Sequence, residues 1–397
     1  MDRARILSLT TIFPSVAQPH HGVFLLNRLA SLVEHPGVEL RVVAPVPYFP
    51  WRTRMFPGYS RYATVPATST PHGIATSHPR YLVLPKFGMS LAPLLLLARL
   101  VPHLVALRRS GFDFDLIDAY YLYPDGVAAA MLGVLFRKPV ILSALGSDVS
   151  LLPSFTIPRW QIRWAAEHAV GLTAVCAALR DEMARIGIDR QRIRVVPHGV
   201  DTDLFKPLRD RAGFRASQGW VDRIVLSVGH LIPRKGHHLA IEAVAGMPDA
   251  RLIVIGEGPE MCRLQKLART LGMADRVSFT GVMAQDQLAA FMGGADVLLN
   301  CSDREGIANV LLEAMACGTP VAATAVWGTP EVITVPEAGR LIAGRTAGAV
   351  AEALTRLFTD PPDRAATRRH AERFTWDGTT RLHMAAVRDC LGAWRAT

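Results

Sequence analysis

The sequence has few of the features that mark disulfide-stabilised, zinc-binding or disordered proteins. Its 397 residues include five scattered cysteines and no Cys-x-x-Cys pair, which argues against a disulfide scaffold or a zinc site. Charged residues make up 20% and apolar residues 50%, so collagen-like, low-complexity and disordered chains are excluded. The formal net charge is +10, and only five of the 44 basic residues are lysine. This balance fits three anionic partners: nucleic acid, a membrane surface or phosphorylated small molecules.

Two apolar stretches resemble membrane-directed segments. The first, MDRARILSLTTIF at the N-terminus, lacks a small-residue cleavage site, and a buried first strand is the better interpretation. The second, residues 91–107, is interrupted by Pro93, Arg99, Pro102 and His103. We expect it to be too short and too broken to span a bilayer. The sequence therefore predicts a cytoplasmic protein, with peripheral association at the inner face of the plasma membrane as the alternative.

Short apolar runs alternate with helical patterns along almost the whole chain. The strands predicted before residue 197 are residues 6–12, 40–46, 81–84, 116–119, 140–144 and 171–175. The helices predicted between them are residues 23–33, 91–109, 125–136, 158–168 and 177–186. Continuous apolar strands separated by helices are typical of parallel sheets covered on both faces. The first half is therefore predicted to be one doubly wound domain.

A turn-rich segment, residues 197–207, interrupts this pattern before the alternation begins again. The strands predicted after it are residues 224–228, 251–255, 276–280, 296–300 and 321–324. The helices predicted after it are residues 236–245, 259–271, 285–292, 309–317 and 346–358. The expected fold is α/β, with two Rossmann-like doubly wound domains that face a central cleft. We place the domains at residues 1–196 and 197–375.

The most informative block is residues 300–321, NCSDREGIANVLLEAMACGTPV. Glu305 and Gly306 lie in a loop after a predicted strand, and a predicted helix from Asn309 carries Glu313. Gly306 permits a tight turn before the helix N-terminus, where free N–H groups and the helix dipole favour an anion. Glu313, about one turn inside, is placed to accept hydrogen bonds from sugar hydroxyls beside a phosphate. The alternative is an acidic residue on a solvated helix, but the combination is far more specific.

A second block supplies positive charge after another predicted strand. Arg234 and Lys235 precede Gly236, where a helical pattern begins. Two cations with backbone N–H groups can neutralise a bound phosphate group without a metal. The alternative for such a pair is a solvated turn.

These motifs resemble those of the retaining glycosyltransferases of family 4, which have the GT-B fold. The block around Glu305 resembles the family's Glu-x7-Glu signature, and residues 228–236 resemble its donor-diphosphate loop. Residues 255–259 and 279–282 resemble its nucleotide-side loops, and residues 198–207 its interdomain segment. The resemblance covers essentially the whole chain, and within the family it points to bacterial enzymes of surface-polysaccharide assembly.

The resemblance implies an enzyme of the EC 2.4 class, of the hexosyltransferase type. It would move a sugar from a nucleoside-diphosphate donor to a saccharide or polyprenyl-linked acceptor, in polysaccharide or glycolipid assembly. It also implies that the last helix, residues 376–397, crosses back to complete the N-terminal acceptor domain. The C-terminal domain would then bind the donor.

The resemblance also assigns roles to individual residues. Glu313 would hold the ribose hydroxyls, and Glu305 the donor sugar. Arg234 and Lys235 would hold the diphosphate and, with Glu305, form the catalytic set. The implied donor-binding residues are Gly22, Arg234, Lys235, Gly256, Val282, Glu305, Gly306, Ile307, Asn309, Val310 and Glu313.

The acceptor-side candidates lie in the first domain. His20 and His21 follow the first predicted strand and precede Gly22, at a corner that suits a phosphate. Tyr120 and Asp148 end two further strands at the expected cleft. Many relatives have His where Tyr120 stands, so this sequence departs from the family there.

Metals, cofactors and nucleic acid are not expected. Two Asp-x-Asp triplets, at residues 113–115 and 201–203, lie where carboxylates usually cap helices or form turns, and we assign neither to a metal. No cofactor is implied, because the nucleoside-diphosphate sugar is a substrate. The basic residues are dispersed rather than clustered with stacking aromatics, which argues against nucleic acid.

Two other functions fit the same fold. A non-catalytic sugar-nucleotide-binding subunit would lose part of the phosphate and glutamate set, which is complete here. A nucleotide-sugar epimerase would need additional carboxylates in the cleft, and the sequence offers none that we can locate.

The sequence also predicts a docking surface for an anionic membrane. If residues 91–109 form a helix, Arg99, His103 and Ser110 form one narrow stripe. Leucine and valine cover most of the rest, more than the ~100° arc that packing on one sheet face requires. The loop of residues 48–62 adds Trp51, Arg52, Arg54, Phe56, Tyr59 and Arg61. The alternative is a helix enclosed by its own domain.

Overall fold

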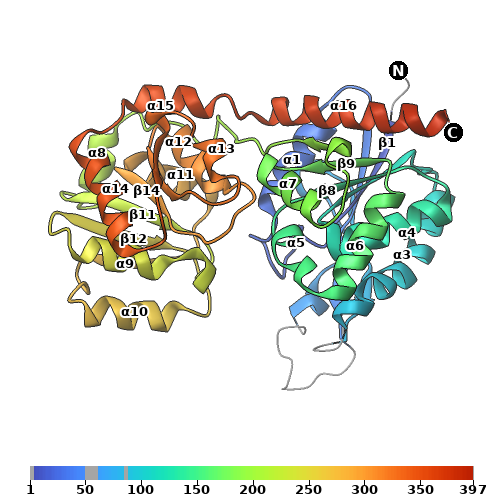
Figure 1. The fold of residues 1–397 in the computed structure, drawn as a ribbon, viewed down its shortest axis with the longest axis horizontal. Helices are drawn as coiled ribbons and strands as arrows, with labels where there is room; N and C mark the ends of the chain where they lie inside the picture. Colours follow the sequence, from blue (N-terminus) through green and yellow to red (C-terminus); the bar gives the residue numbers. More distant parts are fainter. Residues whose placement is uncertain (1–3, 50–60, 85–87, 397) are drawn as a thin grey trace. The chain divides into compact units, whose positions relative to one another are not determined.

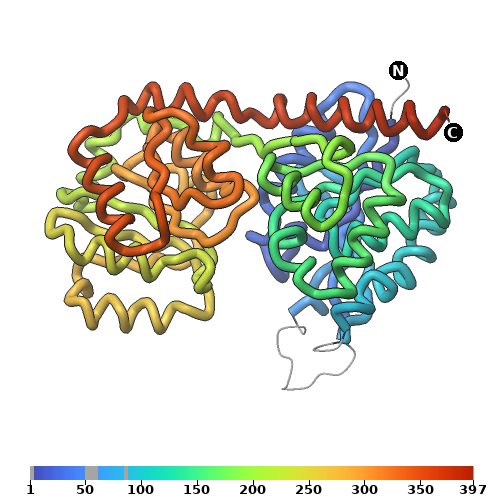
Figure 2. Tube along the Cα trace, viewed as in Figure 1, coloured from blue at the N-terminus to red at the C-terminus, as the bar shows by residue number. Residues whose placement is uncertain are grey.

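The protein folds into two compact units, shown in a computed structural model that describes residues 4–49, 61–84 and 88–396 (Figures 1 and 2). Unit 1 comprises Met1–His198 and Trp376–Thr397, and unit 2 comprises Gly199–Thr375. The chain therefore passes between the units twice, at residues 198–199 and 375–376.

Unit 1 is built on an eight-stranded sheet in the order β10-β9-β8-β7-β1-β2-β5-β4. All neighbours are parallel except β4 and β5. The strands are β1 Ala4–Leu9, β2 Val38–Val43, β4 Thr68–Ser69, β5 Thr76–Ser77, β7 Leu116–Tyr120, β8 Val140–Ala144, β9 Gly171–Ala174 and β10 Ile193–Val195. A separate parallel pair joins β3, Val46–Tyr48, to β6, Arg80–Leu82. Strands β7 and β8 are buried along their whole length, as their continuous apolar sequences predict.

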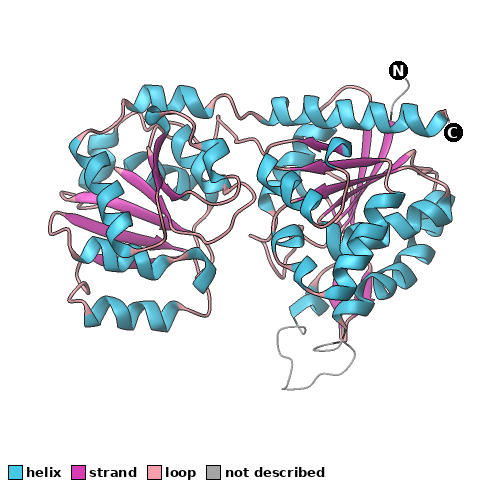
Figure 3. Cartoon of the chain, in the orientation of Figure 1, coloured by secondary structure: helices cyan, strands magenta, loops and turns pink. Residues whose placement is uncertain are grey.

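Helices cover the sheet of unit 1 on both faces (Figure 3). They are α1 Val23–Val33, α3 Ala92–Arg109, α4 Val127–Phe136, α5 Ser147–Ser150, α6 Thr156–His168, α7 Ala177–Arg185 and α16 Trp376–Arg395. Because the chain moves from β1 to β2 in one direction and from β7 to β8 in the other, right-handed crossovers place α1 and α4 on opposite faces. Helix α16 packs beside α1, and α4 packs between α3 and α6.

Unit 2 contains a six-stranded, fully parallel sheet in the order β13-β12-β11-β14-β15-β16. The strands are β11 Arg223–Val228, β12 Ala250–Ile255, β13 Val277–Gly281, β14 Val297–Asn300, β15 Val321–Thr324 and β16 Gly339–Ile342. The helices are α8 Arg211–Ser217, α9 His237–Ala245, α10 Met261–Thr270, α11 Gln285–Gly294, α12 Asn309–Ala316, α13 Thr329–Val332, α14 Ala347–Thr359 and α15 Arg364–Ala371. Two apolar clusters form the core of this unit.

The predicted α/β fold with two Rossmann-like units is confirmed, and most predicted elements are present within two residues of their expected ends. The sequence interpretation missed β10, β16, α8 and α15, and also the short elements β3, β4, β5, α5 and α13. Strand β16 begins at a glycine and carries Arg340, and α15 (RAATRRHA) is mostly polar, so neither shows the apolar pattern that identified the others. The predicted strand 81–84 forms β6, outside the main sheet.

The expectation that residues 91–107 are too short and broken to span a bilayer was wrong on length and composition. Among the described residues, one helical segment, Met89–Arg109, is long and apolar enough to cross a membrane, with a mean hydropathy of 1.8 over its most apolar window. The helix continues through Pro102, which removes one backbone hydrogen bond but does not end it. Helix α3 nevertheless packs against α4 and β6, as a covering helix of unit 1 does.

A buried polar cluster fastens α16 to the rest of unit 1. The His383 Nε2 lies 2.9 Å from Asp118 Oδ2 on β7, and its Nδ1 lies 3.2 Å from an Arg28 nitrogen on α1. Since Arg28 can only donate, Nδ1 accepts and Nε2–H donates to Asp118, which describes a neutral imidazole. Tyr120 completes the cluster, with its hydroxyl 3.5 Å from His383 and its ring 5.1 Å from the Arg28 guanidinium. All four side chains are almost fully buried.

We predict that His383→Ala lowers the free energy of unfolding of unit 1 by about 3 kcal/mol, because it leaves Asp118 and Arg28 buried without their shared partner. Chemical denaturation followed by circular dichroism measures the change. Arg381→Ala, at an exposed position on the same helix, is the matched control and should change stability by less than about 0.5 kcal/mol. Equal effects of the two substitutions would contradict a structural role for the cluster.

Candidate functional site

The site residues of unit 2 gather where the strand order reverses. The chain leaves β11 toward β12 on one side, while β14 lies on the other side of β11. In open α/β sheets, ligands bind at such a switch point, beyond the carboxyl ends of the strands. Residues 229–236 follow β11, and residues 301–308 follow β14, so both loops meet at this place.

Three charged side chains join the two loops. The Glu305 carboxylate accepts a short hydrogen bond from Lys235 Nζ and one of 2.8 Å from the Ser302 hydroxyl, and it lies 3.5 Å from Arg234. Burial alone would raise the pKa of Glu305, but Lys235 and Arg234 hold it below its ordinary value. The group of Arg234, Lys235 and Glu305, called here the 234–235–305 triad, carries a net charge of +1 when all three are ionised.

Glycines allow the loops to approach each other closely. Gly236 has φ 70°, and a Cβ there would lie 2.3 Å from the Cys301 carbonyl oxygen. Gly256, after β12, has φ 140°, and its Cβ would lie 2.0 Å from the Gly229 carbonyl oxygen. No side chain fits at either position, so both glycines are required by the packing of the loops.

The N-terminus of α12 presents unused hydrogen-bond donors. Within the part of the chain that the structure describes, no acceptor lies within hydrogen-bonding reach of the backbone N–H groups of Gly306, Ile307 and Ala308. The Asn309 side-chain oxygen is buried and also has no hydrogen-bond partner among the described residues. Because the dipole of α12 adds positive potential at the same end, these groups are arranged to receive an anion.

Glu313 lies one turn further along α12. Burial raises the pKa of this carboxyl group to about 7. No hydrogen bond or ion pair involving the Glu313 carboxyl connects it to the other described residues. A partly buried carboxyl without a partner costs stability, and an incoming hydroxyl would supply the missing donor.

The remaining predicted donor residues are placed around this point. Val282 follows β13 and is 40% exposed, while Ile307 and Val310 pack partly against the core. Gly256 donates its N–H to the Gly281 carbonyl at 2.8 Å, which ties the loop after β12 to the end of β13. Gly22 lies in unit 1.

Three supporting residues escaped the sequence interpretation. Arg345 donates to the carbonyls of Cys301 and Pro233, both at 3.0 Å, and so braces the two site loops together. Ser302 bonds Glu305 directly, and the Thr324 hydroxyl donates to the Ser302 carbonyl at 2.5 Å. Arg345 lies about 40 residues beyond Glu305 in a turn without a motif, so only the fold brings it to the site.

Unit 1 contains a pocket of about 170 Å³ at the carboxyl ends of β1 and β2. It is lined by Thr11, Phe13, Ser15, Gln18, His21, Ala44, Pro45, Val46, Pro47, Tyr62, His78 and Tyr81. Tyr62 donates to Gln18 at 2.7 Å. Partial burial and nearby Arg61 lower the pKa of His21, so its ring is neutral at pH 7. Polar groups and aromatic rings of this kind suit a hydroxylated ring.

His20 and Gly22 flank His21 in different ways. His20 is exposed and does not line the pocket. Gly22 begins α1 with φ 77°, and a Cβ at this position would lie 2.5 Å from the Ile12 carbonyl oxygen. Of the three residues of this corner, the structure therefore brings only His21 into the pocket.

Tyr120 and Asp148 require a correction as acceptor-side candidates. Tyr120 is fully buried in the cluster with His383, and burial and nearby Asp118 raise its pKa well above the ordinary value. The Asp148 carboxylate is also fully buried and accepts backbone N–H groups of Leu122, Leu145 and Gly146 at 2.6–3.2 Å. Both residues shape the strand ends, and neither lines the pocket.

The Asp-x-Asp carboxylates have structural partners. Asp113 pairs with Arg108 and Lys138, and Asp201 accepts the N–H groups of Asp203 and Leu204. Within residues 4–49, 61–84 and 88–396, no group of three or more His, Cys, Asp or Glu side chains is arranged to hold a metal ion.

Each of the two units matches a family model of glycosyltransferases. The model of glycosyltransferase family 4 matches residues 23–204, and the model of glycosyl transferases group 1 matches residues 211–374. A D-inositol 3-phosphate glycosyltransferase of Mycobacterium tuberculosis is 37% identical over 224 residues, which cover 53% of this chain and 46% of that protein. The chain spans about half the length of the curated relatives it matches.

Solved structures share the fold of the whole chain. Sucrose-phosphate synthase from Thermosynechococcus elongatus superposes with a TM-score of 0.79 at 20% identity, covering 98% of this chain and 100% of that chain. Anabaena HepE in complex with UDP superposes with a TM-score of 0.73 at 20% identity, covering 97% and 99%. These matches confirm the resemblance: the chain belongs to the family 4 type of glycosyltransferases and has the GT-B fold.

Proposed function

We propose that this protein transfers a hexosyl group from a nucleoside-diphosphate donor to a saccharide acceptor, with retention of configuration at the anomeric carbon. The observation that carries the proposal is the 234–235–305 triad beside the unused N–H groups of residues 306–308. A site with a net positive charge and free amide donors suits a diphosphate. The Anabaena HepE structures with UDP and with UDP-glucose support the same donor class, and retention rests on the family assignment.

The triad gives each residue a distinct task. In the transfer, a bond forms between an acceptor hydroxyl oxygen and the anomeric carbon, and the bond from that carbon to the diphosphate oxygen breaks. The proton of the acceptor hydroxyl passes to the departing diphosphate. The charge that grows on the diphosphate would be met by Arg234, Lys235 and the amide donors at α12. Glu305 holds both cations in place before the donor arrives and would then accept hydrogen bonds from the hydroxyl groups of the sugar. Glu313 would hold the ribose.

The acceptor is proposed to bind in unit 1. The pocket beside His21, with Gln18, Tyr62 and His78, offers neutral polar groups and aromatic walls of the kind that bind sugar rings. An acceptor carried on a polyprenyl phosphate is the finer form of this proposal. Assembly of a polysaccharide or glycolipid is the pathway class that would use such a product.

We predict that Arg234→Ala combined with Lys235→Ala lowers kcat at least 100-fold, because leaving-group charge is greatest in the transition state. Donor turnover with UDP-glucose and a panel of saccharide acceptors measures this. Lys266→Ala, at an exposed position of α10, is the control and should be unaffected. Folding of the double variant is checked by circular dichroism, since Glu305 loses both cations. A folded double variant with normal turnover would contradict the assignment.

Glu313→Gln should weaken donor binding and yet stabilise the fold. A charged acceptor of hydrogen bonds is lost, so UDP affinity by calorimetry should fall at least tenfold, about 1.5 kcal/mol. The folded pKa of about 7 lies above the ordinary value of 4.5, so wild type loses stability as pH rises between these values.

The stability advantage of Glu313→Gln should therefore be absent below pH 4.5, grow up to pH 7 and then level off at about 2–3 kcal/mol. Thermal melts across this pH range measure it. Glu337→Gln, at an exposed position, is the control. An advantage that does not vary with pH would show that the carboxyl is not the source.

Transfer is expected to continue in the presence of a chelator. Arg234, Lys235 and the N-terminus of α12 would neutralise the diphosphate, so no divalent ion is needed for that task. The measurement is turnover with and without excess EDTA, followed by addition of magnesium or manganese. A strict requirement for either ion would refute the metal-independent form of the proposal.

A further inference from the structure

Unit 1 exposes a large apolar surface that no other described element covers. It is formed mainly by two segments. The first is the short 3-10 helix η3, Met89–Leu91, with the beginning of α3. The second is the short 3-10 helix η5, Leu152–Ser154, with the beginning of α6. The exposed members of the surface are Leu82, Leu84, Met89, Leu91, Leu94, Leu151, Phe155, Ile157 and Trp160. Trp160 is 66% exposed and Ile157 51%, which are high values for such large apolar side chains. We call this set the α3–α6 apolar surface.

Contacts between the two segments show that they are adjacent. Gln161 of α6 donates from its side chain to the Ser90 carbonyl of η3 at 3.2 Å. Segment η3 also contacts α6, and η5 packs against the start of α6. Leu84 joins the same surface, since its carbonyl accepts the Gly88 N–H at 2.8 Å just before η3. The exposed residues therefore belong to neighbouring segments of unit 1 rather than to distant parts of its surface.

The charge of the surrounding sequence has a single sign. From residue 40 to residue 112 there is no Asp or Glu, while nine residues are Arg or Lys. The segment that carries Phe155 and Trp160, residues 149–166, also has no acidic residue and contains Arg159 and Arg163. Arg99, Arg159 and Arg163 are exposed. An apolar patch within a region that is predominantly basic, although α6 also carries the exposed Glu167, complements a surface that is apolar inside and anionic outside.

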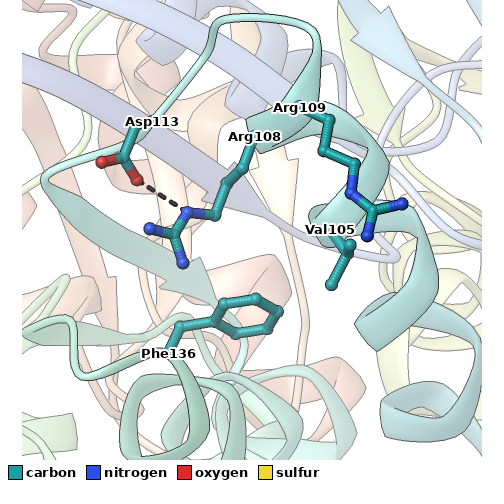
Figure 4. Close-up of a pocket in the computed structure, with 5 residues that line it drawn as sticks. All are labelled: Val105, Arg108, Arg109, Asp113 and Phe136. Carbon is teal, nitrogen blue, oxygen red and sulfur yellow. Dashed lines mark hydrogen bonds and ion pairs between the residues drawn. The ribbon is translucent and has the colours of Figure 1, made fainter.

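Helix α3 combines apolar and basic side chains as far as its C-terminal end. Pro93, Leu96, Leu100 and Leu104 of the helix are buried, most of its other large apolar side chains are half-buried, and Leu94 is exposed. The helix ends at a shallow pocket of about 380 Å³ with Val105, Arg108, Arg109, Asp113 and Phe136 (Figure 4). Arg108 is held by Asp113 at 2.8 Å, while the Arg109 guanidinium points away from that carboxylate.

We propose that the α3–α6 apolar surface docks unit 1 on an anionic lipid bilayer. Trp160, Phe155 and Ile157 would enter the headgroup and upper acyl region, while Arg99, Arg159 and Arg163 contact lipid phosphates. A protein partner would need a matching apolar and acidic face, whereas an anionic bilayer offers both properties by itself. The docking is independent of the proposed activity, because no residue of the candidate site belongs to this surface.

In this proposal the α3–α6 apolar surface rests on the bilayer, and helix α3 does not cross it. Leu96, Leu100 and Leu104 of α3 pack into unit 1, and His103 lies 2.8 Å from the Ser77 hydroxyl of β5. Crossing the membrane would strip α3 from these contacts and leave Arg99 and His103 in hydrocarbon. The sequence-predicted loop of residues 48–62 adjoins this region in the chain, but Trp51, Arg52, Arg54, Phe56 and Tyr59 lie outside the described residues, as does Lys86.

The surface lies next to the pocket of unit 1. Tyr81 of β6 lines the pocket, and its neighbour Leu82 belongs to the α3–α6 apolar surface. Successive side chains of a strand point to opposite sides, so β6 separates the two regions by a single strand. A docked unit would hold its pocket close to the plane of the headgroups.

The test is co-sedimentation of the full chain with vesicles. Wild type should bind vesicles of phosphatidylcholine with 30% phosphatidylglycerol at low salt, bind at least tenfold less at 0.5 M salt, and bind pure phosphatidylcholine vesicles weakly. Arg159→Glu combined with Trp160→Ser should lower binding at least tenfold. Arg381→Glu combined with Leu382→Ser, a basic and apolar pair on α16 that is also exposed, should bind as wild type does.

Each other outcome overturns the proposal. Negligible wild-type binding, or equal loss in both double variants, would show that this surface does not dock on lipid. Retention of the protein in carbonate-washed membranes would show that it spans the bilayer. Hydrolysis of UDP-glucose in the absence of vesicles is measured for all variants, so failure of the proposed activity is recognised separately from failure of docking.

Discussion

Unit 2 depends on the attraction between one buried carboxylate and two cations. Glu305 and Lys235 are 70 residues apart, and their ion pair holds together the loops that follow β11 and β14. Because burial works against ionisation of Glu305, the cations must stay within a few ångströms, which fixes both loops. The absence of a side chain at Gly236 and the two carbonyl bonds of Arg345 follow from the same need for close approach. The position of the triad at the switch point then leaves its surplus positive charge facing the place where ligands of such sheets bind.

The polar groups at the strand ends of the two units are bonded differently. In unit 1, Asp148 accepts several backbone N–H groups, and one oxygen of Asp125 accepts the N–H and the hydroxyl of Thr11, while its other oxygen has no partner among the described residues. In unit 2, the N–H groups after Glu305, the Asn309 side-chain oxygen and the Glu313 carboxyl lack partners among the described residues. Unsatisfied polar groups reduce stability unless something else pairs with them. Their concentration within one loop and one helix turn marks the place where this chain gives up stability for a ligand.

The sequence was most informative where all the residues that define an element or a site lie in one short segment. Buried parallel strands such as β7 and β8 are continuous apolar runs, and the loop and helix around Glu305 hold the glycine, the asparagine and both glutamates within a dozen residues. It was least informative where the fold joins distant segments. The pocket of unit 1 combines Gln18 with Tyr62 and His78, and no local pattern connects them. Tyr120 was misassigned because its position at a strand end suggested an open site, whereas His383, 263 residues away, covers it. Burial by a remote helix cannot be inferred from the strand itself.

Helix α16, which returns from unit 2 to unit 1, decides which face of the unit 1 sheet is covered. Helix α16 supplies His383, and the cluster with Asp118 and Arg28 closes the face of the sheet on which α1 lies. Helix α16 covers that face of the sheet. The exposed apolar side chains of unit 1 lie elsewhere, along α3 and at the start of α6. A soluble covering helix needs only its inward stripe to be apolar, and α3 satisfies this with four buried residues. Leu94 of α3 and Trp160 of α6 remain exposed and take no part in that packing, and the proposed lipid contact would give them a partner. Since β6 carries both Tyr81 of the pocket and Leu82 of this surface, a contact there would also decide from which side an acceptor reaches the pocket.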